Sequence, residues 1–568
     1  MVISNTDHQE TPTSRKDDSE AEGKTLLLAS SGGQDNCSLK HSPSSQLEAA
    51  ATSARNLIRR TSSVVWDERP KTPAGWSILL AAMASMLVGY ELQLQQQLTC
   101  PPLVFLQDDD HENNPPSLIH LIYRHLTRHS DSILSQNITP SLWVGTRSLL
   151  ATSLAVVTGI PNHSDHHLRL QEIVTMPMDG AQIALYWEAP LVEPPNNTNT
   201  KQQQAPSRII ITRETLLQGP IDKPLVLILH GLNNNSSCGY IRSLQRIISN
   251  RGHIAVAMNF RGCQCPLTSP RGYNGAYTGD LRSVVHMIVG RLHSASVPLF
   301  LVGHSLGGNI ITKYLGEEGL SGTLHPSIVA GASLANPLDI HSRNNVHTPW
   351  KQLMAWGAKM DILSKWKTFQ QLTGYPEVRK ALWGIVKATT MDQFDEAVFP
   401  LLLRNDPYYP FGIHIGYESV EEYWKDCSSY RFVKHITVPL LQIIAGDDPV
   451  VYHCFQRKLT HSIRNPNVMS VETKCGGHLG WQESPPPQSQ NNSDNDNGDR
   501  PSWAGRATAD FIDAVLEIRK TQASSGPVQW SSSEHIINKN NHDRQAENNS
   551  VGSTRTDHSD APLLRSRL

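Results

Sequence analysis

The middle of the chain alternates short, continuous runs of apolar residues with segments that have helical periodicity. The first three apolar runs are Leu225–Leu229, Ile254–Met258 and Pro298–Val302. Each is followed by a segment with the spacing of a helix, over residues 240–250, 279–292 and 306–315. Strands that are apolar throughout are typical of a parallel sheet covered by helices on both faces. The pattern therefore predicts the α/β class with a mostly parallel central sheet.

Further segments extend this core. Residues 176–187 contain an Asp-Gly pair followed by alternating apolar residues, which predicts a β-hairpin. Two more strand-like runs cover 327–335 and 440–445, and a final helix is predicted over 503–520. The long stretch over 342–435 is helical in pattern and rich in Trp, Tyr and Leu. Since open α/β sheets bind ligands at the carboxyl edge of their strands, we interpret this stretch as a lid insertion over that edge.

Close to the N-terminus, the stretch from Thr72 to Tyr90 carries no charge. Its length predicts a transmembrane or membrane-anchoring helix over 72–92, followed by a helical, membrane-proximal segment over 93–165. Basic residues precede the stretch, which predicts a single-pass protein with its N-terminus in the cytoplasm, in an endomembrane. The alternative is a buried or interfacial helix, because Ala, Ser, Gly and Met make the stretch only moderately apolar.

Composition limits the remaining possibilities. Residues 1–70 and 521–568 are dominated by polar residues without an apolar period, so both are predicted to be disordered tails. This leaves one catalytic domain over 166–520, which a polar insertion over 485–500 interrupts. A formal net charge of −2, from 50 basic and 52 acidic residues, argues against a nucleic-acid partner. Eight cysteines in 568 residues are too few for a disulfide scaffold.

The strongest chemical signal is a Gly-x-Ser-x-Gly motif. The sequence GHSLG at 303–307 stands directly after a predicted buried strand and before a predicted helix. Glycines at 303 and 307 remove the Cβ atoms that would clash in so tight a turn, which exposes Ser305 as a nucleophile.

A serine hydroxyl needs an adjacent base, and the base needs an acid that orients it. In the order typical of such folds the acid follows the serine, and the histidine comes last. Asp448 follows the strand-like run 440–445 and is the preferred acid, with Asp447 in reserve. His478 lies in a glycine-rich loop and is the predicted base. The backbone N–H groups of Leu232 and Leu306 are predicted to form the oxyanion hole.

Neither a metal nor a cofactor is predicted. The spacings of His120, His125 and His129 do not place all three on one helical face. Cys263 and Cys265 lack a second cysteine pair at metal-ligand spacing. Arg261 and Asp280 are predicted to form a buried pair that supports the fold under the active site.

Several blocks resemble the AB-hydrolase 4 family of abhydrolase-domain serine hydrolases, which includes bacterial YheT-like and plant embryogenesis-associated proteins. They are HGL at 230–232, YIR at 240–242, NFRGC at 259–263, PLTSPR at 266–271, YTGDL at 277–281, GHSLGGNIITK at 303–313, FDEA at 394–397, DDP at 447–449 and GGHLGW at 476–481. The resemblance covers about 165–520 and implies an α/β-hydrolase fold with a triad of Ser305, Asp448 and His478. It also implies esterase or lipase activity on monoacylglycerols, phospholipids or medium-chain ethyl esters, and an N-terminal membrane anchor. The chain differs from the family in the loop NNNSS at 233–237, in the insertion 485–500 and in both tails.

Three functions are consistent with these residues. The first is a membrane-anchored carboxylic ester hydrolase that acts on lipid-like acyl esters through an acyl-enzyme. The second is an acyltransferase that passes the same acyl group to an alcohol. The third is a non-catalytic ligand-binding module, for which the loss of a triad residue would be the sign, and here all three are present.

Overall fold

A computed structural model of the chain describes thirteen segments. They are residues 27–28, 73–107, 116–129, 132–157, 160, 167–190, 211–269, 272–341, 348–365, 376–399, 417–462, 464–484 and 501–524. The chain divides into two compact units, Met1–Leu516 and Glu517–Leu568. The described part of the second unit is the end of helix α16 (Trp503–Ser524). The predicted tails lie almost wholly outside the described residues, and the insertion 485–500 lies entirely outside them.

Six buried parallel strands form the centre of the first unit, in the order β6-β5-β7-β8-β9-β10. Their bounds are β5 Leu225–Leu229, β6 Ile254–Met258, β7 Leu299–His304, β8 Ile328–Leu334, β9 Leu440–Ala445 and β10 Val468–Thr473. Every residue of these strands is buried, as expected for a sheet covered on both faces. The predicted α/β class with a mostly parallel sheet is therefore confirmed.

Antiparallel strands complete both edges of the described sheet. On one edge, β4 (Gln182–Pro190) pairs with β6, and β3 (His167–Thr175) pairs with β4 in the predicted hairpin. On the other edge, β2 (Leu103–Phe105) pairs with β10, and the two-residue β1 (Leu27–Leu28) pairs with β2.

Strands β2 and β10 were not predicted from the sequence. In β10 apolar residues alternate with Ser470 and Glu472, which suggests an exposed face, yet both side chains are buried. Glu472 pairs with Arg457 of α15 (His453–Ser462), 3.2 Å away, which compensates for part of its burial.

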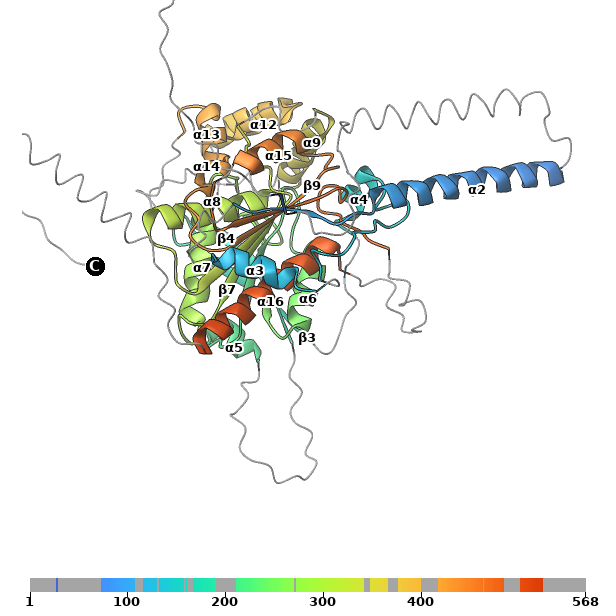
Figure 1. The fold of residues 1–568 in the computed structure, drawn as a ribbon. Helices are drawn as coiled ribbons and strands as arrows, with labels where there is room; N and C mark the ends of the chain where they lie inside the picture. The colour runs from blue at the N-terminus through green and yellow to red at the C-terminus, as the bar shows by residue number, and fades with distance from the viewer. Residues whose placement is uncertain are drawn as a thin grey trace, which may run out of the picture. The chain divides into compact units, whose positions relative to one another are not determined.

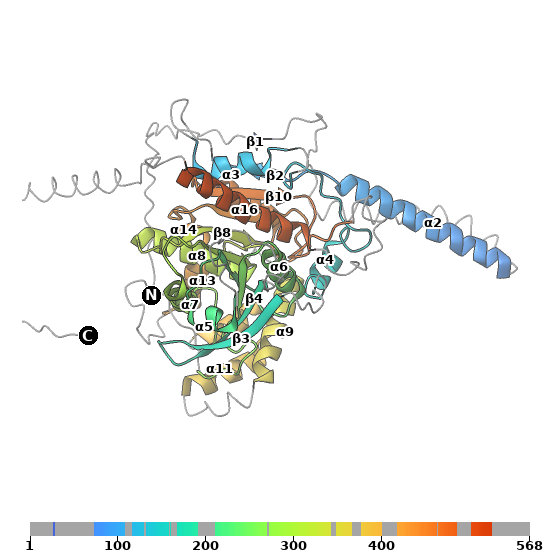
Figure 2. The same ribbon diagram turned by 90° about the horizontal axis from the view of Figure 1, so that it is seen from below.

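Helices cover the two faces of the sheet (Figures 1 and 2). Helix α6 (Gly239–Asn250) and the part of α16 up to Leu516 lie on one face, and α7 (Gly279–Arg291) and α8 (Leu306–Ser321) lie on the other. Arg251, which caps α6, forms ion pairs of 2.6 Å with Asp510 and Asp513 of α16. Smaller helices are α3 (Leu118–Leu126), α5 (Arg213–Gln218) and α14 (Tyr430–Val433).

Four helices within the stretch 342–435, hereafter the cap helices, gather at the upper end of the view in Figure 1. They are α9 (Thr348–Ser364), α11 (Pro376–Lys387), α12 (Met391–Val398) and α13 (Val420–Cys427). Their buried apolar residues form a cluster of their own, which includes Phe394 and Trp424. Residues 342–347, 366–375 and 400–416 of this stretch lie outside the described residues.

The N-terminal helix corrects one prediction. The stretch predicted to span a membrane forms α2 (Pro73–Leu98). The structure does not support the prediction that it crosses a membrane, because no helix among the described residues combines the length and hydrophobicity that a membrane span requires. Small and weakly apolar residues make up much of the first half, and Glu91, Gln93 and three further glutamines follow in the second half. Beyond α2, the segment 93–165 contains α3, α4 (Ser148–Leu154) and strand β2.

Candidate active site

The sheet topology itself places the site. Strand β5 has β6 on one side and β7 on the other, so the chain runs from β5 to β6 in one direction and then crosses back past β5 to reach β7. Open α/β sheets bind ligands at such a reversal. The loop after β5 begins at His230, and Ser305 follows the end of β7 directly. The last residue of β5, Leu229, pairs with Gly303 of β7, so the two strands end side by side. The two loops that were predicted to carry the chemistry therefore meet at this reversal.

Ser305 lies in a sharp turn between β7 and α8. Its φ of 53° and ψ of −116° are unusual for a residue with a Cβ atom, and such strain is typical of an exposed nucleophile. The turn depends on glycine, because a Cβ atom on Gly303 would lie 2.3 Å from the Gly307 carbonyl oxygen. A Cβ atom on Gly307 would lie 2.6 Å from the His230 carbonyl oxygen. Close packing of three backbone segments thus explains the motif.

Hydrogen bonds link the three predicted triad residues. The distance between His478 Nε2 and Ser305 Oγ is 2.8 Å, and that between His478 Nδ1 and Asp448 Oδ2 is also 2.8 Å. Asp448 is only 5% exposed, and its Oδ1 accepts the N–H groups of Val450 and Val451 at 2.8 and 3.0 Å. Because a carboxylate only accepts hydrogen bonds, Nδ1 carries the proton and Nε2 is left to accept from the serine hydroxyl.

Asp447, the reserve acid, faces a different partner. Its Oδ1 accepts the backbone N–H of Gly477 at 2.9 Å, immediately before His478. Desolvation, with smaller contributions that include the charge of Asp448, raises the pKa of Asp447 to about 7. The structure therefore separates two adjacent acids: Asp448 contacts the histidine ring, and Asp447 contacts the backbone of the histidine loop.

The loop after β5 is tightly held. The buried His230 bonds through Nδ1 to the Gly231 carbonyl at 2.8 Å, and its Nε2 accepts the N–H of Phe260 at 3.1 Å. Burial lowers the pKa of His230 to about 4, so the ring is neutral and can accept this bond. The N–H of Gly231 donates to the Tyr240 hydroxyl at 3.1 Å, and a Cβ atom on Gly231 would lie 3.2 Å from Ser305 Cβ. The loop thus runs directly beside the serine.

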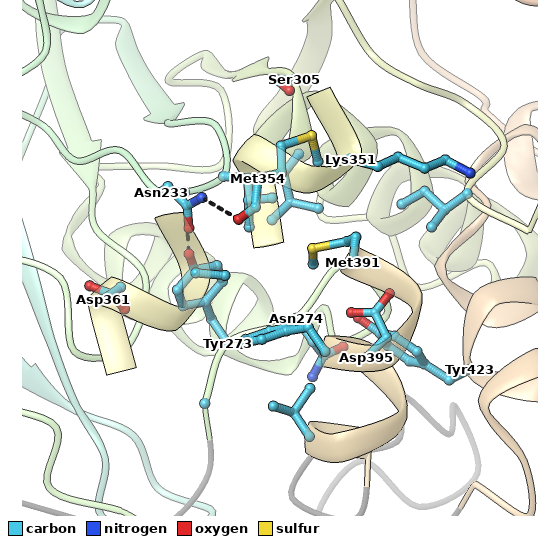
Figure 3. A pocket seen from close by; sticks show the side chains of 18 of the residues that line it. Asn233, Tyr273, Asn274, Ser305, Lys351, Met354, Asp361, Met391, Asp395 and Tyr423 are labelled. Carbon is cyan, nitrogen blue, oxygen red and sulfur yellow. Dashed lines mark hydrogen bonds between the residues drawn. The ribbon is translucent and has the colours of Figure 1, made fainter. Parts of the chain in front are cut away.

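Both predicted oxyanion-hole residues border the same cavity as Ser305. Leu232 follows Gly231, and Leu306 begins α8. In the part of the chain that the structure describes, neither of their N–H groups donates a hydrogen bond. In the divergent loop, Asn233 has a φ of 58°, a conformation that asparagine tolerates better than most residues. Its amide donates to the Met354 carbonyl of α9 at 3.3 Å (Figure 3), which ties this loop to the cap helices.

A residue far upstream supports the histidine loop. Thr152 of α4 accepts the backbone N–H of His478 at 2.8 Å, and it donates to the Ser148 carbonyl at 2.7 Å. The loop needs such support because Gly477 and Leu479 both have positive φ angles, of 58° and 72°. Sequence reasoning missed Thr152, and 326 positions separate it from His478, so no local pattern could have indicated the contact.

The start of α4 is connected in turn to α2. Glu91 of α2 is 1% exposed, accepts the Thr146 hydroxyl at 2.9 Å and pairs with Arg147, the residue that caps α4. Gln95 of α2 donates to the Pro140 carbonyl at 2.7 Å. The N-terminal segment is therefore joined by polar contacts to the element that holds the histidine loop.

A cavity of about 230 Å³ extends from Ser305 under the cap helices. Apolar side chains make up much of its wall, including Leu267, Ile340, Met354, Ile385 and Val398. Figure 3 shows Met354 and Met391 facing each other across it. Such a wall is suited to an aliphatic chain that reaches the serine.

Arg261 forms the predicted buried pair with Asp280 and extends it. The guanidinium contacts both oxygens of Asp280 at 2.5 and 2.6 Å and Asp179 at 2.5 Å. Asp179 belongs to the hairpin turn, so the network joins that turn to α7. Elsewhere in the described segments, no group of three or more His, Cys, Asp or Glu residues is arranged to hold a metal ion.

A serine at a strand–helix turn, hydrogen-bonded to a histidine and beside two backbone N–H groups, is an arrangement typical of serine hydrolases. Comparison with known proteins agrees on the class. Residues 224–485 match the family model described as the alpha/beta hydrolase fold.

The chain is also similar in sequence to lipases and esterases of yeast and human. The chain is 30% identical over 270 residues to a monoacylglycerol lipase of Saccharomyces cerevisiae, over 46% of this chain and 55% of that protein. It is 29% identical over 322 residues to medium-chain fatty acid ethyl ester synthase/esterase 2 of the same yeast, over 52% of this chain and 64% of that protein. It is 26% identical over 433 residues to human monoacylglycerol lipase ABHD2, over 73% of this chain and 88% of that protein. The chain thus spans less than two thirds of the length of either yeast relative.

Proposed function

We propose that the chain is a carboxylic ester hydrolase of the AB-hydrolase 4 type, with Ser305, His478 and Asp448 as its catalytic triad. The observation that carries this proposal is the hydrogen-bonded chain from Ser305 Oγ through His478 to Asp448 at the mouth of a largely apolar cavity. The buried carboxylate and the loop histidine have the order and geometry that activate a serine hydroxyl.

In the proposed reaction, Ser305 Oγ attacks the acyl carbonyl while His478 Nε2 takes its proton. The N–H groups of Leu232 and Leu306 stabilise the oxyanion, and the proton passes to the leaving alcohol. Water, deprotonated by the same histidine, then attacks the acyl-enzyme; the bond from the acyl carbon to Ser305 Oγ breaks, the histidine returns the proton to Oγ, and the acid is released. Asp448 keeps Nδ1 protonated and the ring aligned throughout.

The apolar cavity supports acyl esters of lipid type as substrates, and the names of the yeast and human relatives support monoacylglycerols and medium-chain esters. The cap helices would act as the lid over this substrate. Exposed apolar side chains on α2, among them Met83, Met86 and Leu87, support association with a lipid surface. Flotation of the full chain with lipid vesicles, compared with the chain in which all three are replaced by serine, tests that association.

A fluorophosphonate probe tests the triad directly, since it labels only activated serines. Wild-type chain should be labelled, whereas Ser305→Ala should not be labelled and His478→Ala should react at least about a thousandfold more slowly. Ser296→Ala and His286→Ala are matched surface controls and should react like wild type. Folded wild-type chain that is not labelled would refute the hydrolase and favour a ligand-binding module.

An acyltransferase is the second candidate, because the name of one yeast relative includes both a synthase and an esterase. The two activities differ only in whether water or an alcohol reaches the acyl-enzyme. Product analysis with and without added ethanol separates them: an ethyl ester that accumulates in place of the free acid would identify acyl transfer.

A further inference from the structure

One wall of the cavity contains a carboxyl group that the triad does not use. Asp395 of α12 lines the same cavity as Ser305, and its side chain lies among those of Met391, Asn274 and Tyr423 (Figure 3). It is 8% exposed although it carries an ionisable group. A buried carboxyl group is costly unless hydrogen-bond partners satisfy it.

Only one of the two carboxyl oxygens of Asp395 accepts a hydrogen bond from the described part of the protein. Oδ2 accepts the indole N–H of Trp424 in α13 at 2.9 Å. Oδ1 has no hydrogen-bond partner among the described residues. The neighbouring charges, Asp392 and Glu396, are both negative and therefore do not neutralise it.

These surroundings decide which form of the group faces the cavity. Burial, reinforced by the two acidic neighbours, raises the pKa of Asp395 to about 7. The group is thus a neutral carboxylic acid over a wide range below that pH. A neutral carboxylic acid offers both an O–H donor and a carbonyl acceptor, as a hydroxyl group does. In an apolar wall, that combination matches an alcohol on the ligand better than a hydrocarbon chain.

We propose that Asp395 determines substrate specificity by hydrogen-bonding a hydroxyl group of the ester. This inference rests on the proposed hydrolase and names its substrate class: acyl esters with a free hydroxyl on the part that lies under the cap helices. The hydroxyl can belong to a hydroxylated acyl chain or to a polyol such as glycerol in the alcohol part. Both sources present the same chemistry to the carboxyl group.

Three substrates of equal acyl length separate these possibilities. They are a plain acyl ethyl ester without a hydroxyl, the same acid as its monoglyceride, and a hydroxylated acyl ethyl ester. For wild type, kcat/KM should be higher for one of the hydroxyl-bearing esters than for the plain ester. In Asp395→Leu that advantage should shrink about tenfold or more, because the hydroxyl-bearing ester loses more of its kcat/KM than the plain ester does. Asp395→Asn, which can still donate and accept, should retain part of the advantage.

Matched controls distinguish recognition from a structural role. Trp424→Phe removes the indole N–H but keeps the carboxyl group, so it should preserve the hydroxyl preference. The rate of fluorophosphonate labelling reports whether Ser305 is intact in every variant. If Asp395→Leu does not fold, Asp395→Asn and Trp424→Phe still test the proposal.

Several results would overturn the inference. An equal loss of kcat/KM on all three esters in folded Asp395 variants would show that the residue has a structural role. An unchanged hydroxyl preference in Asp395→Leu would also refute it, as would wild type that shows no hydroxyl preference. Failure of the proposed function is a separate result, since wild type would then hydrolyse none of the esters and would not be labelled.

Discussion

Replacement of Thr152 by valine tests whether the N-terminal segment sets the activity of the catalytic histidine. Valine has nearly the shape of threonine but cannot accept the N–H of His478, which Thr152 accepts at 2.8 Å. A buried N–H group that loses its acceptor costs about 1–3 kcal/mol. The loop has few ways to compensate, because Gly477 and Leu479 already have positive φ angles.

If that cost appears as a lower population of correctly placed His478, the rate should fall by about 5- to 150-fold, since 1.4 kcal/mol corresponds to a factor of ten. The loss should fall on kcat with KM little changed, because Thr152 does not line the substrate cavity. The assay is the rate of fluorophosphonate labelling together with steady-state hydrolysis of a medium-chain ester. Unfolding in urea should confirm that the variant is folded.

Two further variants define the result. Thr152→Ser keeps the hydroxyl and should remain within a few-fold of wild type. Ser153→Val changes an exposed neighbour on the same helix and should have little effect. A Thr152→Val chain that is folded and as active as wild type would refute the argument, and so would an equal loss in Thr152→Ser.

Three other predictions concern stability. Gly303→Ala should lower the free energy of unfolding by about 3 kcal/mol or more and abolish labelling, because its Cβ would lie 2.3 Å from a backbone oxygen; a folded, labelled variant would contradict this. Glu188→Ala should lower the free energy of unfolding, measured in urea, by about 3–5 kcal/mol. The fully buried carboxylate lies 2.6 Å from Arg242 and 2.7 Å from Arg246, and its removal leaves both guanidinium groups without this partner. A loss below about 1 kcal/mol would count against that pairing. Burial raises the pKa of Asp395 from 3.8 to about 7, so its contribution to stability is greatest below pH 3.8 and is lost as the pH rises towards 7. The stability of Asp395→Asn relative to wild type should therefore rise over this window, by at most about 1.4 kcal/mol per pH unit, and parallel stability curves would exclude the shift.

Much of the central sheet could be predicted because its signal is local. Strands β5, β6 and β9 begin and end where the apolar runs do, since a strand buried on both faces must be apolar at every position. Strand β10 escaped prediction because Ser470 and Glu472 interrupt its apolar run, and Glu472 is buried only beside Arg457. That partner comes from another element, so the run itself gives no sign of it.

The nucleophile turn and the order of the three candidate triad residues could also be predicted from the sequence. A Gly-x-Ser-x-Gly turn is a constraint on five consecutive residues, and the close approach of Gly303 to Gly307 lies within that segment. The choice between Asp447 and Asp448 was less secure, because adjacent residues in a turn point in different directions. Only the folded loop shows Asp448 against the His478 ring and Asp447 against the Gly477 backbone.

Short-range pattern along the chain was enough to predict the α/β class, the strand-to-helix turn at Ser305 and a helix near the N-terminus. It did not determine whether that helix could cross a membrane, which depends on the hydrophobicity of its whole length. Tertiary structure alone decided that Thr152 supports the His478 loop and that Asp395 faces the cavity of Ser305. These contacts join residues that are distant in the chain, and packing brings such residues together without leaving a periodic signal in the sequence.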